Sequence, residues 1–199
     1  MEIAALFKLL LLFVHLLAFA VAAGYIMRED VRFLRSGDIQ LEALAETAYV
    51  AVRALALLWI TGIAMILIDT AGDLSLLAGK PKLLAKLTVV SLLTINGVLL
   101  HRLAFPTLEG TAERPLSAAM TAVVGAVSAV SWMYAAFMGI AKPLAPVLGY
   151  GGFIALYMVV LAVGLGFALT VLRPRIEHVL SQQKGRNHVG HAPQAMPAA

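Results

Sequence analysis

Long apolar runs, separated by short charged or glycine- and proline-containing segments, are the main pattern along the chain. Five runs occur, and each is long enough for a membrane-spanning helix once its weakly polar neighbours are included. A helix needs about 20 predominantly apolar residues to cross the roughly 30 Å hydrocarbon core of a bilayer. The pattern therefore predicts five spans, at residues 4–27, 48–68, 83–104, 116–140 and 150–172.

The segment after the first run predicts a helical hairpin. Arg28, Arg32 and Arg35 keep helical spacing beyond the apolar residues, and Gly37 and Asp38 follow. Glycine suits the residue that ends a helix, and aspartate suits the cap of the next one. The first two helices are thus expected to extend past the bilayer with their tip at Gly37. The charges of this hairpin form either a solvated stem or a docking site.

The second and third runs are joined by a segment with its own helix signals. Asp73 can cap a short apolar helix from Leu74 to Ala78. Pro81 suits the first turn of the next long helix, because proline lacks an N–H that would be left unpaired there.

Prolines also mark the ends of the last run. Pro143 and Pro146 place the start of its helix near Tyr150, and Pro174 is expected to interrupt a short amphipathic piece after it. Residues 1–180 are predicted to form the membrane domain. The polar residues 181–199 are predicted to be a disordered cytoplasmic tail.

Composition agrees with a membrane protein. Of the 199 residues, 61% are hydrophobic and 13% are charged, against about 25% charged in soluble domains. The predicted fold class is all-α, a polytopic bundle of five transmembrane helices whose partner is the lipid bilayer. The absence of cysteine excludes disulfides, thiol catalysis and cysteine-ligated metals. The net charge of +4 is interpreted as topology charge, not as a nucleic-acid-binding surface.

Arginine and lysine predict the orientation. Ten of them fall in the hairpin, the third loop and the C-terminal region, and five fall on the other side of the membrane, at Lys8, Lys80, Lys82, Lys86 and Lys142. Cytoplasmic loops carry the excess of these residues. The expected location is a bacterial-type inner membrane, multi-pass, with the N-terminus outside and the C-terminus in the cytoplasm.

Small residues line one face of the fourth run. Ala118, Ala122, Ala126 and Ala129 recur on that face, and Gly125 lies beside them. Helices in lipid are held together by close packing of such residues. We expect backbones to approach closely at Gly125. The Ala118–Ala129 face is also the candidate contact for a homo-oligomer or a partner membrane protein.

Polar residues at membrane depth are the candidates for chemistry, because they are rare and costly there. His15 lies near the middle of the first span beside Ala18 and Ala22. It is a candidate ligand for a flat macrocycle such as b-type haem or for a metal ion. The alternatives are a neutral imidazole bonded to a neighbouring helix and a proton relay.

Lys86 and Asn96, both in the third run, are the further candidates for cofactor binding. Lys86 either pairs with Asp69 or Asp73 or serves the His15 site. Asn96 either joins two helices or orients His15 through a hydrogen bond.

Two stretches carry a resemblance to a family. Residues 15–24, HLLAFAVAAG, and the stretch from Lys86 to Val90 that runs on to Asn96-Gly97 and His101-Arg102 resemble small bacterial inner-membrane proteins. That group includes the copper-resistance D-type proteins, the membrane-bound haem-dependent protoporphyrinogen oxidases and uncharacterised families. In those oxidases a histidine in the first span and a lysine opening the third are linked to haem. The resemblance implies haem-linked roles for His15 and Lys86.

Three functional classes follow. The first is a haem-binding or redox membrane protein centred on His15 and Lys86. The second is a permease for a metal or a small solute, for which several methionines could help copper. The third is a non-catalytic scaffold or assembly protein that docks through the charged hairpin. The sequence does not decide whether the protein is an enzyme.

Overall fold

The computed structural model describes residues 2–36 and 40–190, and these residues form helices and no β-strand. The α-helices are α1 (Glu2–Ser36), α2 (Leu41–Thr70), α3 (Pro81–Leu99), α4 (Phe105–Glu109), α5 (Ala118–Ile140), α6 (Ala145–Phe167) and α7 (Arg173–Gly190). Five helical segments are long and apolar enough to cross a membrane: Ile3–Ser36, Leu41–Thr70, Pro81–Glu109, Ala118–Ile140 and Lys142–Gln182. The predicted all-α bundle with five candidate spans is confirmed.

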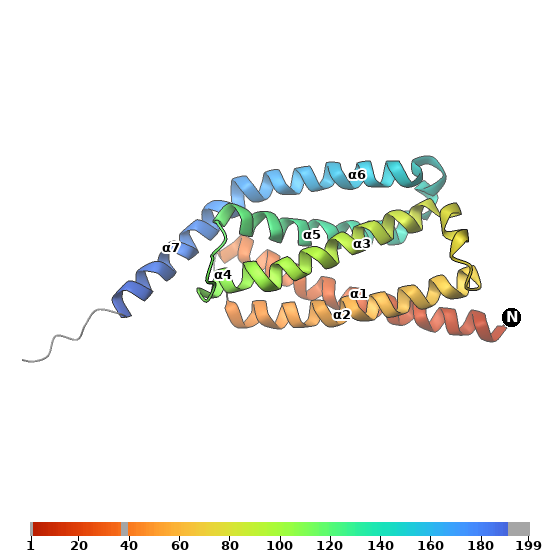
Figure 1. Cartoon of the computed structure of the whole chain (residues 1–199), viewed down its shortest axis with the longest axis horizontal. Coiled ribbons are helices and arrows are strands. Elements are labelled where there is room, and N and C mark those ends of the chain that lie inside the picture. Colours follow the sequence, from red (N-terminus) through yellow and green to blue (C-terminus); the bar gives the residue numbers. More distant parts are fainter. Residues whose placement is uncertain (1, 37–39, 191–199) are drawn as a thin grey trace, which may run out of the picture.

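The long helices run along one axis of the molecule (Figure 1). α1 and α2 form an antiparallel pair, α3 packs against α5, and α6 packs against both α3 and α5. α7 projects from the end of the bundle at which α1 ends and α2 begins (Figure 1). The predicted tip residues Gly37 and Asp38 lie outside the described residues. α2 begins at Leu41 after Gln40, whose side chain makes no capping hydrogen bond.

The segment between α2 and α3 is as predicted. Asp73 Oδ1 accepts hydrogen bonds from the Ser75 backbone N–H at 2.9 Å and from Ser75 Oγ at 2.6 Å. These bonds hold the pKa of Asp73 below its ordinary value, because they favour the carboxylate. A 3₁₀ helix follows from Leu74 to Gly79, and α3 begins at Pro81. The sequence was sufficient to predict the cap at Asp73 and the helix start at Pro81, because both depend on neighbouring residues only.

The last span begins with a short helical piece that the sequence did not predict. This piece starts at Ala145, with Pro146 in its first turn, where a missing N–H leaves no hydrogen bond unmade, and the regular helix starts after Gly149, near Tyr150 as predicted. The backbone then turns at Gly149, which has φ of 56°. Only glycine adopts this left-handed conformation without steric cost. The chain therefore bends at Gly149 before it continues as a regular helix.

Pro174 does not interrupt the helix, contrary to the prediction. A π-helical segment, Ala168–Leu172, precedes it, and a second π-helical segment, Leu100–Ala104, precedes Pro106 in the third span. Proline lacks an N–H and crowds the carbonyl four residues before it. The wider π turn gives room for the ring, so the helix passes through. α7 continues to Gly190, so residues 181–190 are helical where the sequence predicted disorder, and residues 191–199 lie outside the description.

The small-residue face of α5 packs within the chain. Ala118, Ala122 and Ala126 are buried with Leu108, Ala168 and Ile176. A partner bound through these alanines would have to displace α4 and the helices that follow α5, and such a contact stays a prediction.

A tight helix contact at a glycine lies elsewhere than predicted. An added Cβ at Gly125 would meet no atom within 4 Å, whereas one at Gly164 on α6 would collide with Cγ2 of Val130. The expectation of close packing at Gly125 is therefore wrong, because α5 presents Val130 and not Gly125 to the nearest turn of α6.

Candidate functional site

His15 is held by α2. Its Nδ1 lies 2.8 Å from Thr61 Oγ1, and Thr61 Oγ1 in turn lies 2.7 Å from the Leu57 carbonyl. A hydroxyl has one hydrogen, and the carbonyl can only accept. Thr61 therefore donates to Leu57 and accepts from the Nδ1–H of His15. In the neutral imidazole this leaves Nε2 with its lone pair.

The ring of His15 is also fixed by packing. A Cβ at Gly62 would lie 3.6 Å from His15 Cε1, so the imidazole rests against the backbone of α2 at a residue without a side chain. Ala18 and Ala22, which the sequence placed on the same face as His15, are buried against Ala54 and Leu58 of α2. Thr61 could not be predicted as the partner of His15 from the sequence, because the register of α1 against α2 is not encoded by neighbouring residues.

Lys86 on α3 is half-buried and interacts electrostatically with His15. The predicted pairing with Asp69 or Asp73 is wrong. Asp69 forms its ion pair with Lys8, and Asp73 bonds to Ser75. No ion pair of Lys86 is found in the part of the chain that the structure describes.

The other charges near Lys86 are also positive. Lys82 lies within electrostatic range of Lys86, and Lys142 lies within range of Lys82. Three ammonium groups thus gather near the end of the bundle where α3 begins, and Lys86 is the one that interacts electrostatically with His15. Since like charges repel and burial of a charge is costly, this arrangement favours an anion near Lys86.

Asn96 joins α3 to α5, which is one of the two predicted roles. It is 5% exposed, and its Nδ2 donates to the Val124 carbonyl of α5 at 3.0 Å. The hydrogen bond that orients His15 comes from Thr61, so the predicted bond from Asn96 to His15 is not the one that the structure has. A direct role of Asn96 in cofactor binding stays a prediction.

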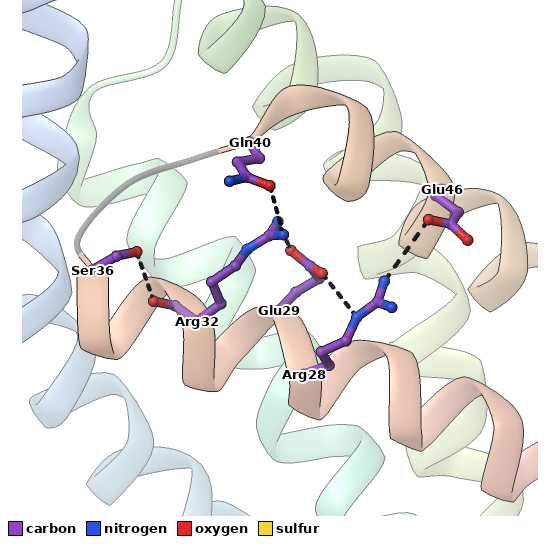
Figure 2. A network of polar contacts seen from close by, with 6 residues as sticks. All are labelled: Arg28, Glu29, Arg32, Ser36, Gln40 and Glu46. Carbon is purple, nitrogen blue, oxygen red and sulfur yellow. Dashed lines mark hydrogen bonds and ion pairs between the residues drawn. The ribbon is translucent and has the colours of Figure 1, made fainter.

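The charged hairpin residues pair with one another across α1 and α2, as Figure 2 shows. Glu29 accepts from Arg28 Nε at 3.3 Å and also from Arg32. Arg32 Nη1 donates to Gln40 Oε1 at 2.8 Å, and Arg28 Nη2 lies 3.8 Å from Glu46 Oε2. Glu29 is only 9% exposed. The network therefore ties the two helices together, and Glu29 is not the solvated residue that the sequence predicted.

The described side chains contain no group of three or more His, Asp or Glu that could hold a metal ion. Comparisons of the chain with family models, curated proteins and solved structures found no match. The resemblance to the haem-dependent oxidases therefore stays a prediction.

Proposed function

We propose that the protein binds b-type haem in the membrane in a redox role, with His15 Nε2 as the iron ligand and Lys86 as the partner of a propionate. The observation that carries the proposal is the hydrogen bond from His15 Nδ1–H to Thr61. Metal-binding histidines almost always donate their other ring N–H to a fixed acceptor, which sets the tautomer and the ring orientation. Haem, when bound, would supply one-electron chemistry.

The ligand set favours haem over a bare metal ion. A transition metal held by protein alone needs about three or four side-chain ligands, and the described residues offer no such group. A porphyrin brings four nitrogen ligands of its own, so a single histidine is enough to attach it. His15 as a ligand for a metal ion without a macrocycle therefore has less support.

Lys86 supports an anionic ligand at the same place. It is half-buried and lacks a carboxylate partner among the described residues. A buried charge is normally paired. A propionate would supply the missing negative charge, and the electrostatic interaction between Lys86 and His15 supports a ligand that involves both residues.

The absorption spectrum of protein purified from haem-supplied cells tests the proposal. Wild type should show a Soret band, His15→Ala should abolish it, and Lys86→Ala should weaken or shift it. Thr61→Val should lower haem affinity about 10- to 100-fold, because the imidazole loses its orienting acceptor. The matched control is His101→Ala, an exposed histidine whose Nδ1 bonds to the Gly97 carbonyl, and it should keep the band. A wild type without Soret absorbance, or a His15→Ala variant that retains it, would refute the proposal.

The proposal includes the orientation in a bacterial-type inner membrane, with the N-terminus outside. Arg175 of α7 bonds to the carbonyls of Phe33 at 3.2 Å and Leu34 at 2.5 Å. The arginines of the hairpin and of α7 thus gather at one end of the bundle. Lys8 and Lys80 both contact Asp69 at the other end. The positive-inside rule then supports a cytoplasmic location for the arginine-rich end.

A further inference from the structure

Two adjoining cavities lie between the α1–α2 hairpin and α3, α5 and α6, at the arginine-rich end of the bundle. The larger, of about 310 Å³, is mostly apolar and is lined by Phe33, Leu108, Val130, Phe167 and Ile176 among others. The smaller, of about 160 Å³, lies toward the middle of the bundle, against Trp132. Both are bordered by Asp30, Leu44, Phe105, Gly125 and Ala129, so they meet along a common wall.

The smaller cavity has an unsatisfied hydroxyl in its wall. Thr47 lines it, is 6% exposed and has no hydrogen-bond partner for Oγ1. Buried polar atoms are nearly always hydrogen-bonded, and an exception calls for a bound group. A threonine in a helix can bond to the carbonyl four residues before it, as Thr61 does. Thr47 does not, which leaves its hydroxyl for a ligand.

Asp30 and His101 add two acceptors to the same cavity. The carboxylate of Asp30 has no ion pair in the described part of the chain, whereas the adjacent Glu29 is paired with two arginines. His101 Nδ1 lies 2.9 Å from the Gly97 carbonyl and must donate to it, so Nε2 of the neutral ring accepts. A ligand that carries both O–H donors and oxygen acceptors would match these groups.

We propose that the two cavities bind a membrane quinone or quinol, with its ring in the smaller cavity and its apolar tail in the larger one. Trp132 and Phe105 supply aromatic walls for a flat ring. A quinol O–H can donate to Asp30 or His101, and a ring oxygen can accept from Thr47. The site shares no residue with the His15 site and does not depend on the proposed haem.

A phospholipid chain fits the same space less well. An acyl chain could fill the larger cavity, but its headgroup phosphate would come close to Asp30 and Glu29, and the like charges would repel. A chain alone would also leave Thr47 unpaired. The polar groups of the smaller cavity therefore favour an oxygen-bearing ring.

Intrinsic fluorescence of Trp132 tests the proposal. The chain has two tryptophans, so Trp59→Phe leaves Trp132 as the only emitter, in the wall of the smaller cavity. The protein in phospholipid nanodiscs is titrated with ubiquinone-1. Binding gives a saturable quenching component, whereas collisions in the bilayer give quenching that stays linear in quinone concentration.

Variants decide where the quinone binds. Gly125→Leu places a side chain in the open space that both cavities share and should weaken binding at least 10-fold. Gly166→Leu is the matched control, because an added Cβ there also meets no atom within 4 Å and Gly166 borders neither cavity. It should leave binding unchanged. Thr47→Val, which keeps side-chain size and removes the hydroxyl that would donate to a ring oxygen, should weaken ubiquinone-1 binding several-fold. It serves as the test if Gly125→Leu does not fold.

Several results would overturn the proposal. Quenching that is linear in every variant would mean that the cavities hold water only. Saturable quenching by brominated phospholipid that Gly125→Leu removes and ubiquinone-1 does not displace would assign the space to a lipid chain. His15→Ala should leave quinone binding unchanged, and a loss of binding in that variant would place the quinone at His15 instead.

Discussion

Replacing Gly164 by alanine tests how closely α5 and α6 approach each other. The added Cβ would collide with Cγ2 of Val130 on α5. Valine has one strongly preferred side-chain rotamer in a helix, so the methyl cannot turn away freely. We expect the two helices to separate or the Val130 side chain to leave its rotamer, at a cost in the free energy of unfolding.

The size of the effect follows from two opposed contributions. Overpacking in a close-packed interior costs about 1–3 kcal/mol. Alanine in place of a helical glycine contributes about 0.5–1 kcal/mol in the other direction. Gly166→Ala, on the same helix and without a neighbour within 4 Å, should show only the favourable part. Gly164→Ala should therefore be less stable than Gly166→Ala by about 1–3 kcal/mol, because the backbone contribution cancels in the comparison.

Val130→Ala completes the test. On its own it removes two methyl groups from the contact between α5 and α6 and should destabilise the protein by about 1–2 kcal/mol, because packing contacts are lost. In combination with Gly164→Ala it also removes the collision, so the double variant should be more stable than the sum of the single effects predicts, by about 1–3 kcal/mol.

Unfolding in mixed micelles of a mild detergent and dodecyl sulfate, followed by circular dichroism, gives the free energies of the wild type and the four variants. Equal stability of Gly164→Ala and Gly166→Ala, or strictly additive effects in the double variant, would refute the close approach at Gly164.

Two further predictions concern hydrogen bonding and topology. Tyr134→Phe should cost about 1 kcal/mol in the same micelles, because the buried hydroxyl donates to the Phe153 carbonyl at 2.6 Å; Tyr49→Phe, at an exposed residue, should cost nothing measurable. Reporter fusions after Gly37 and at Ala199 should report the cytoplasm and one near Gly79 the outside, and a cytoplasmic signal at Gly79 would reverse the proposed orientation.

The sequence alone was sufficient for features that depend on neighbouring residues. Five apolar stretches of sufficient length predicted the five candidate spans. Asp73 and Pro81 predicted the cap and the helix start that the structure has. The length of an apolar stretch, helix capping and the backbone restriction of proline are properties of contiguous residues. They can therefore be predicted without knowledge of how the helices pack.

The contacts between helices could not be read in this way. In a soluble helix the apolar face marks the core, but in a membrane helix both the lipid-facing and the buried residues are apolar. The pattern therefore gave the spans without saying which face packs. The pattern wrongly predicted a close helix contact at Gly125, and it did not predict the hydrogen bond between His15 and Thr61.

The tertiary structure also decided which charges are paired. Asp69 meets Lys8 and not Lys86, since the register of α1 against α2 brings those two side chains together. Lys86 is thereby left half-buried without an ion pair among the described residues, and Thr47 lines the smaller cavity without a hydrogen-bond partner. The surroundings of Lys86 and of Thr47 depend on how whole helices pack, because a small rotation or shift of one helix changes the contacts of every side chain on it.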